Sequence, residues 1–383
     1  MKRILVCASR MSHILNFHLP YIESFGKLGY TVDIAAENAC AHPLAENYYD
    51  LRFVKNPLSV QNLKTVFQLR ALMLENRYDI VISNSTLSGA AARMAAKMLG
   101  SERPRCVHIS HGYMFGSKAD ISSQVYKTVE RLCAGVTDTL IVMNREDLLF
   151  ALKYHLGKRI FFTNGMGLNT SEFPPISDED RKSFRKKIGA SDDTVVFLCA
   201  GELSERKNQS FLIEAFDSVC KKHPDTLLVL AGSGDRLYEL KRLVQRLELT
   251  QKVRFLGHYK DMNTLYRSSD VLLSASKMEG LPFNVMEALY CGTPVIASDI
   301  KGHKELIKSG YNGLMFKIDK HDPAAAAKLM NSVLSNKSFL DRLRLNTFLQ
   351  DKFCLESVRP ELVSVITGHR QSAEIKSPEG AFK

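Results

Sequence analysis

The stretch 276–287 places two carboxylates on either side of a tight turn. It reads Ser-Lys-Met-Glu-Gly-Leu-Pro-Phe-Asn-Val-Met-Glu, so Glu279 and Glu287 flank a Gly-Leu-Pro turn. An apolar run at 270–275 indicates a buried strand before the turn, and 284–290 has helix-forming residues after it. The free N–H groups of such a helix start favour an anion such as a phosphate. Carboxylates beside that anion would repel it unless they reach past it to hydroxyls, and sugar or ribose hydroxyls are natural partners.

A second stretch combines a glycine with two adjacent cations. Gly201 follows a β-rich run, and Arg206 and Lys207 stand just before a predicted helix at 210–219. Cations at a helix start oppose the helix dipole, so a bound polyanion such as a diphosphate explains them better. Arginine offers such a ligand a planar fork and lysine a point charge. Taken alone, the stretch is also consistent with a solvated basic turn.

Short apolar runs alternate with longer helical patterns along the whole chain, which predicts α/β architecture with parallel sheets. Helices such as 63–76 and 122–133 separate the strands. The predicted strands of the first half are 3–8, 31–36, 51–54, 78–83, 105–110, 139–143 and 159–163. Those of the second half are 194–200, 226–231, 253–256, 270–275, 294–297 and 313–316. We therefore predict two Rossmann-like, doubly wound sheets.

Glycines and prolines interrupt the periodic pattern between 164 and 175, and we predict the domain boundary there. The expected parts are a first domain at 1–167, a second at 168–353, a helix at 354–369 that packs back on the first domain, and an unstructured polar tail at 370–383. Ligands of open α/β sheets bind beyond the carboxyl ends of the strands, so a cleft between the two domains is the expected site.

Composition narrows the classes of partner and of compartment. A chain of 383 residues exceeds the size at which one core keeps growing, and its net charge of +11 favours anionic partners such as sugar nucleotides or anionic lipid. The absence of tryptophan and of a dense Lys/Arg block argues against nucleic acid. The eight cysteines lack metal-ligand spacing, so no metal site or disulfide framework is expected.

No run approaches the roughly 18 apolar residues of a membrane-spanning helix. We expect a cytoplasmic protein that can lie peripherally on the inner face of the cell membrane. The basic, partly apolar stretch 63–74 is a candidate for contact with anionic lipid, and a core helix with a solvated edge is the alternative.

Together the two stretches resemble the retaining glycosyltransferases of family 4, which have the GT-B fold. The Glu-Gly turn with its continuation at 288–298 and the Gly-x-Leu-x-x-Arg-Lys-Asn turn carry the resemblance, which covers nearly the whole chain. The segment 108–113, His-Ile-Ser-His-Gly-Tyr, looks most like bacterial exopolysaccharide and capsule enzymes. The resemblance implies metal-independent transfer of a hexose or N-acetylhexosamine from a nucleoside-diphosphate sugar, with UDP as the expected nucleotide. The implied acceptor is a lipid-linked glycan, bound by the first domain, while the second binds the donor.

The resemblance also implies roles for single residues. Arg206 and Lys207 match the pair that holds the donor diphosphate and stabilises the charge on the departing nucleotide. Glu287 matches the carboxylate that binds the ribose hydroxyls, and Glu279 matches the one that binds the donor sugar. For Glu287 alone, a first-turn glutamate that complements a helix dipole is the alternative. His111 corresponds to a histidine near the reacting carbon, although a lone histidine is more often a satisfied polar group.

Backbone groups and side chains at further positions are expected to approach the donor. These positions are Gly201, Gly280, Leu281, Phe283, Asn284, His258 and Tyr259. The segment 9–20 departs from the family because it lacks the glycine pair that many relatives have after the first strand. In it, His13, Asn16 and His18 are candidates for contact with the acceptor, and a helix cap or a buried aromatic residue explains them equally well.

Two other functions remain open at this point. A sugar-nucleotide epimerase on the same scaffold would isomerise the donor without an acceptor. A non-catalytic sugar-nucleotide-binding partner of a polysaccharide assembly complex would bind without turnover. A hydrolase with two carboxylates as its acid and base is rejected, because the resemblance implies that both bind hydroxyls and because the anion site lies between them.

Overall fold

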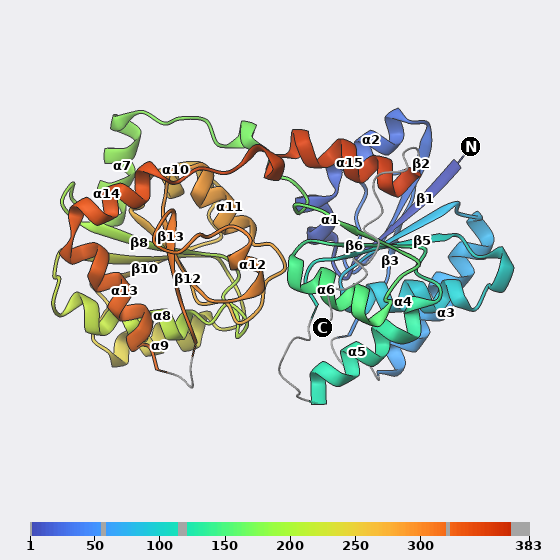
Figure 1. Cartoon of the computed structure of the whole chain (residues 1–383), viewed down its shortest axis with the longest axis horizontal. Helices are drawn as coiled ribbons and strands as arrows, with labels where there is room; N and C mark the ends of the chain where they lie inside the picture. Colours follow the sequence, from blue (N-terminus) through green and yellow to red (C-terminus); the bar gives the residue numbers. More distant parts are fainter. Residues whose placement is uncertain (1, 55–58, 114–120, 319–321, 369–383) are drawn as a thin grey trace. The chain divides into compact units, whose positions relative to one another are not determined.

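The computed structural model describes residues 2–54, 59–113, 121–318 and 322–368 of the chain. It separates into two compact units, 1–167 together with the chain from Leu355 onward, and Leu168–Cys354 (Figure 1). Gly167 and Leu168, where the first unit gives way to the second, lie in the segment of glycines and prolines. The tail expected at 370–383 lies outside the described residues. No helix in the described ranges is long and apolar enough to cross a membrane.

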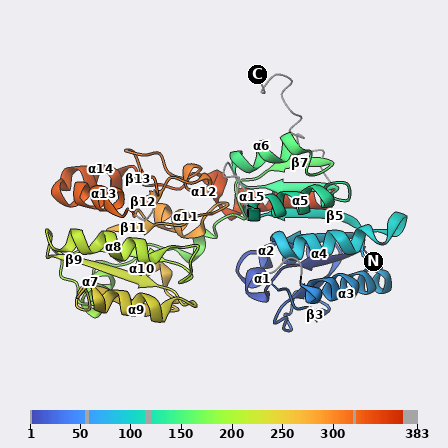
Figure 2. The same cartoon turned by 90° about the horizontal axis from the view of Figure 1, so that it is seen from below.

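The first unit is built on a parallel sheet with the order β3-β2-β1-β4-β5-β6-β7. Its strands are β1 (Lys2–Cys7), β2 (Tyr30–Ala36), β3 (Tyr48–Asp50), β4 (Ile80–Asn84), β5 (Arg105–Ser110), β6 (Thr139–Val142) and β7 (Arg159–Phe162). Its helices are α1 (Met11–Phe17), α2 (Leu19–Lys27), α3 (Val60–Asn76), α4 (Thr86–Lys97), α5 (Ile121–Ala134), α6 (Arg145–Tyr154) and α15 (Leu355–Thr367). Helices α2 and α15 pack together on one face of the sheet. Figure 2 shows α3, α4 and α5 side by side on the other face.

The second unit has a parallel sheet with the order β10-β9-β8-β11-β12-β13. Its strands are β8 (Val195–Ala200), β9 (Thr226–Ala231), β10 (Val253–Gly257), β11 (Val271–Ser274), β12 (Val295–Ser298) and β13 (Gly313–Phe316). Its helices are α7 (Asp178–Ile188), α8 (Gln209–Cys220), α9 (Leu237–Arg246), α10 (Met262–Ser268), α11 (Phe283–Tyr290), α12 (Lys301–Lys304), α13 (Ala324–Ser335) and α14 (Lys337–Leu345). Two doubly wound parallel sheets were predicted, and the structure confirms both.

Both sheets reverse their strand order beside a central strand. The reversal lies between β1 and β4 in the first unit and between β8 and β11 in the second. Loops that leave neighbouring strands on opposite sides of such a point part from each other and leave room for a ligand at the carboxyl ends. The candidate residues that follow β8 and β11 therefore lie at the reversal of the second unit, and those of the segment 9–20 follow β1 at the reversal of the first.

One predicted strand is wrong. The segment 51–54 is not a strand, and the edge strand β3 lies just before it. Leu51 and Phe53 do pack into the core, which explains the apolar signal. The backbone of this segment instead bonds to side chains of α3: Asn62 pairs with both the N–H and the C=O of Val54, and Thr65 Oγ1 donates to Arg52 O.

A buried ion pair joins α4 to α5 under the sheet. Arg93 donates to both carboxylate oxygens of Glu130, at 2.8 and 2.9 Å, and both side chains are only 1% exposed. Burial alone would raise the pKa of Glu130, but the Arg93 charge outweighs it and the pKa is lowered. Removing one member of such a pair leaves the other charge buried without compensation.

We expect Arg93→Met to lower the free energy of unfolding by about 3–5 kcal/mol, because Glu130 would stay buried without its cation. Urea unfolding of the full chain measures this. The matched double variant Arg93→Met/Glu130→Leu should recover most of the loss, since it removes both charges. A single variant within about 1 kcal/mol of wild type would show that the pair is not structurally important.

Candidate active site

The loop after β8 is shaped by a glycine that makes room for a lysine. Gly201 has φ +140°, a backbone conformation that favours glycine. A Cβ at this position would lie 3.2 Å from Cε and 3.5 Å from Nζ of Lys207. The glycine thus lets the Lys207 side chain fold back over the end of β8, where it is only 13% exposed.

The loop after β11 is tied to the loop after β8 by backbone contacts. The N–H of Lys277 donates to Arg206 O at 2.8 Å, and Arg206 Nη1 donates to Met278 O at 3.1 Å. Because β8 and β11 are neighbours in the sheet, the two loops form one structure at their carboxyl ends. The structure therefore brings together the two stretches that the sequence singled out.

Glu279 lies between the two cations of the first loop. Its Oε1 accepts from Arg206 Nη1 at 2.6 Å and from Lys207 Nζ at 2.8 Å, and its side chain is 11% exposed. Burial alone would raise the pKa of Glu279, but Lys207 and Arg206 outweigh this and lower it to about 2. Two cations and one carboxylate leave the cluster with a net positive charge, so it can still attract an anion. The sequence predicted roles for all three residues but not that they contact one another.

Glu287 occupies the second turn of α11 and faces a tyrosine. Its Oε2 accepts a hydrogen bond from the Tyr266 hydroxyl at 2.6 Å. Burial raises the pKa of Glu287, and the bond from Tyr266 offsets this in part. The helix begins at Phe283, so the alternative explanation of Glu287 as a first-turn glutamate is wrong.

Asn284, one of the predicted donor-contact positions at the Gly-Leu-Pro turn, has a structural contact. The side chain of Asn284 donates to Ala200 O at 2.9 Å and so fastens the start of α11 to the end of β8. Leu281 is buried. Gly280 and Phe283 stand on either side of it and of Pro282, where the chain enters α11. These contacts fix the direction in which the first N–H groups of α11 point.

His258 and Tyr259 follow the edge strand β10, and β9 lies between β10 and β8. Gly257, with φ +65°, turns the chain there. The side chain of His258 is exposed, whereas the Tyr259 ring packs on Phe184 with centroids 5.8 Å apart. A ligand that reaches this segment would extend along the carboxyl edge of the sheet, past the end of β9.

Two residues near the Glu279 turn, Gly302 and His303, were not predicted as site residues from the sequence. A Cβ on Gly302 would lie 2.8 Å from Glu279 O and 2.9 Å from Gly280 O, so only glycine fits beneath the turn. The buried ring of His303 lies 3.1 Å from Ser274 Oγ and 2.7 Å from Ser298 O, between the ends of β11 and β12. Burial lowers its pKa to about 4, so the ring is neutral. The sequence feature that could have identified these two residues is their position shortly after the predicted strand 294–297.

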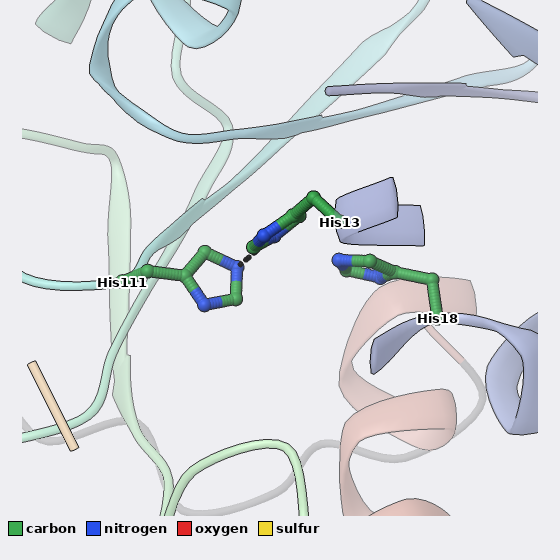
Figure 3. Close-up of side chains that lie close together, drawn as sticks. All are labelled: His13, His18 and His111. Atoms are coloured by element: carbon green, nitrogen blue, oxygen red, sulfur yellow. Dashed lines mark hydrogen bonds between the residues drawn. The ribbon is translucent and has the colours of Figure 1, made fainter. Parts of the chain in front are cut away.

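In the first unit, the segment 9–20 is helical and contributes to a cluster of histidines. It contains α1 and the start of α2. His111, directly after β5, has its Nε2 3.2 Å from His13 Nε2 (Figure 3) and 3.2 Å from Asn84 Oδ1. His18 lies beside them and is buried, whereas Asn16 is exposed on α1. Burial lowers the pKa of His13 to about 4 and those of His18 and His111 well below the usual value, so all three rings are neutral.

Both units are similar to known glycosyltransferases. The family model described as Glycosyltransferase Family 4 matches residues 21–154, and that described as Glycosyl transferases group 1 matches residues 180–349. The putative glycosyltransferase EpsD of Bacillus subtilis is 33% identical over 85% of this chain and 86% of its own length. The UDP-Gal:alpha-D-GlcNAc-diphosphoundecaprenol alpha-1,3-galactosyltransferase of Escherichia coli is 29% identical over 70% of both chains. Among solved structures, sucrose-phosphate synthase of Thermosynechococcus elongatus superposes with a TM-score of 0.78, at 19% identity over 96% of this chain and 99% of that one.

The chain has two Rossmann-like units, and a charged cluster lies at the switch point of the second. This is the architecture of a GT-B glycosyltransferase, and the similarity to sucrose-phosphate synthase confirms that fold. The two family matches, and the similarity to EpsD over most of both chains, identify the family as well as the fold. The chain belongs to glycosyltransferase family 4, and it is a transferase enzyme.

The lowered pKa of Glu279 predicts a specific loss of stability in acid. A carboxyl group with a pKa of about 2 when folded and about 4.3 when unfolded stabilises the protein above the unfolded value, and this contribution is lost as the pH falls through both values. We expect it to amount to about 3 kcal/mol at pH 6 and to fall below about 0.5 kcal/mol by pH 2. Urea unfolding of wild type and Glu279→Gln across this range measures it as a difference that shrinks with falling pH. The exposed Glu179→Gln is the matched control, and parallel profiles for wild type and Glu279→Gln would contradict the expectation.

Proposed function

We propose that this protein transfers a hexose or N-acetylhexosamine from a UDP-linked sugar to a lipid-linked glycan, with retention of the anomeric configuration. The observation that carries the proposal is the cluster of Arg206, Lys207 and Glu279 at the carboxyl ends of β8 and β11. Its net positive charge, beside the first turn of α11, suits a diphosphate. Its carboxylate suits the hydroxyls of the attached sugar.

The contacts within the cluster suggest how donor binding would proceed. Arg206 and Lys207 both contact Glu279 Oε1. A diphosphate would draw both cations toward its oxygens, and Glu279 would then be free to accept hydrogen bonds from the sugar. Cations held against the phosphate in this way stabilise the charge that develops on the departing diphosphate, which lowers the barrier. The cluster therefore couples binding of the phosphate half of the donor to binding of the sugar half.

Other residues would complete the reaction. Glu287, aligned by Tyr266, would bind the ribose hydroxyls. In a retaining transfer the acceptor hydroxyl attacks the face from which the diphosphate leaves, and the departing phosphate oxygen takes its proton, so no protein nucleophile is needed. Neutral His111 would donate a hydrogen bond near the reacting carbon. Arg206 and Lys207 would supply the charge that a metal supplies in other transferases, so the transfer is proposed to be metal-independent.

The choice of donor and acceptor rests on the relatives. The Escherichia coli relative carries UDP-galactose and a diphosphoundecaprenol acceptor in its name. A Campylobacter jejuni relative, 27% identical over 97% of this chain, also has a PP-undecaprenol glycan as its named acceptor. The role in exopolysaccharide or capsule synthesis rests on the segment 108–113 that contains His111.

We expect Lys207→Met to reduce sugar transfer by at least about 100-fold, because loss of one fixed charge on a leaving group has effects of that size. The assay follows labelled sugar from UDP-glucose, UDP-galactose and their N-acetyl forms into lipid extracted from bacterial membranes. The exposed Lys182→Met is the matched control and should retain wild-type rates. NMR of the product should show the anomer of the donor.

Three outcomes would overturn the proposal. An inverted product would exclude the retaining mechanism. Isomerised UDP-sugar in the absence of acceptor would favour an epimerase. Loss of nucleotide binding in Lys207→Met, combined with no turnover by wild type on any donor, would favour a non-catalytic binding protein.

Because the proposed acceptor is lipid-linked, we also propose that the protein contacts the membrane. Helix α3 buries Val66, Leu69 and other residues of one face, yet it exposes 82% of Val60, 53% of Leu63 and 51% of Phe67. Lys64 is exposed beside them. Apolar residues with neighbouring cations suit an anionic lipid surface.

We expect the full chain to sediment with vesicles that contain phosphatidylglycerol and not with purely zwitterionic ones. Leu63→Ser/Phe67→Ser should lose this binding, because apolar area and charge are both needed. Leu345→Ser, which changes an 87% exposed leucine of the second unit, is the matched control. Equal sedimentation of both variants would show that α3 is not the contact surface.

A further inference from the structure

Three histidine rings converge in the first unit (Figure 3). His13 comes from α1, His18 joins α1 to α2, and His111 follows β5. The ring centroids are 4.5 Å apart for His13 and His111, 5.2 Å for His13 and His18, and 6.0 Å for His18 and His111. One ring nitrogen of each residue lies within 4.8 Å of those of the other two.

These spacings are close to those of a three-histidine metal site. Zn–N bonds of about 2.0–2.1 Å in tetrahedral geometry place two ligand nitrogens about 3.3–3.4 Å apart and two imidazole centroids about 5 Å apart. His13 Nε2 and His111 Nε2 are 3.2 Å apart, and the three centroid distances lie on both sides of the tetrahedral value. The His18 nitrogen lies within 4.8 Å of the other two, so it must approach them for all three to coordinate one ion.

His18 supplies an independent observation. The residue is 3% exposed, and its Nε2 is buried without a hydrogen-bond partner among the described residues. A buried polar atom without a partner is costly, and native proteins rarely keep one unless water, an ion or a function accounts for it. In Figure 3 the His18 ring points a nitrogen toward the other two rings. A bound ion would give this nitrogen its partner.

We propose that His13, His18 and His111 bind one divalent transition-metal ion, of which Zn²⁺ is the type, with a fourth position open to solvent or ligand. Three imidazoles favour zinc and its neighbours over magnesium or calcium, which prefer oxygen ligands. His13 and His111 are only half-buried, so the fourth position is accessible. All three ligands belong to the first unit.

Metal binding would require one proton to move. Asn84 Oδ1 can only accept, so its 3.2 Å contact calls for a proton on His111 Nε2. Coordination through Nε2 shifts that proton to Nδ1, and the ring stays neutral.

The test uses the full chain without a polyhistidine tag, stripped with EDTA and titrated with Co²⁺. Tetrahedral Co²⁺ reports its coordination by visible absorption, so the readout needs no turnover and stands apart from the proposed transfer. We expect one Co²⁺ per chain, displaced by one Zn²⁺. His18→Leu and His13→Ala should each weaken Zn²⁺ binding by more than about 100-fold in competition with a chromophoric chelator, because each removes a ligand. His42→Ala, which changes a histidine outside the cluster, should bind as wild type.

Thermal unfolding guards against loss of the fold. His18 Nε2 has no hydrogen-bond partner to lose within the described ranges, so metal-free His18→Leu should unfold at the wild-type temperature or above it. Zn²⁺ should raise the unfolding temperature of wild type and not that of His18→Leu. His13→Ala provides a second variant, at a half-buried helical position that alanine suits. Failure of wild type to bind one ion, or equal binding by wild type and both variants, would overturn the proposal.

Discussion

The contact of Glu279 with Arg206 and Lys207 holds the second unit's site in one piece. The two loops come from strands that are neighbours in space and far apart in sequence, and this shared carboxylate joins them. Other features of the site serve it. Gly201 makes room for the Lys207 side chain, and Gly302 makes room for the turn that carries Glu279. A Cβ at either glycine would press on this contact.

Titratable side chains are buried in both units, but the buried group is charged in the second unit and uncharged in the first. In the second unit it would neutralise Glu279, but two adjacent cations keep the carboxylate charged. In the first unit His18 and His111 have mainly each other and His13 as titratable neighbours, so burial leaves the rings uncharged. One unit thus presents fixed charge, suited to a phosphate, and the other presents neutral nitrogen atoms. A charged leaving group and an uncharged acceptor hydroxyl would need this difference.

The sheets could be predicted from the sequence because buried parallel strands appear as continuous apolar runs, and β5, β9 and β13 have the predicted bounds. The error at 51–54 shows the limit, since Leu51 and Phe53 are core residues of a loop that α3 side chains satisfy. Helix α1 gave no signal, because Arg10 precedes it and makes no side-chain capping bond. Without α1, the sequence could not place His13 and His18 beside His111. The contact of Glu279 with Arg206 and Lys207 was likewise hidden, because only the pairing of β8 with β11 creates it.

Recognition of the donor diphosphate by Arg206 and Lys207 can be measured by titration calorimetry of UDP and of uridine against wild type and Lys207→Met. We expect wild type to bind UDP much more tightly than uridine, and Lys207→Met to lose most of this difference while its weak affinity for uridine is unchanged. Equal binding of UDP and uridine by wild type, or a full preference for UDP in Lys207→Met, would show that these cations do not recognise the diphosphate.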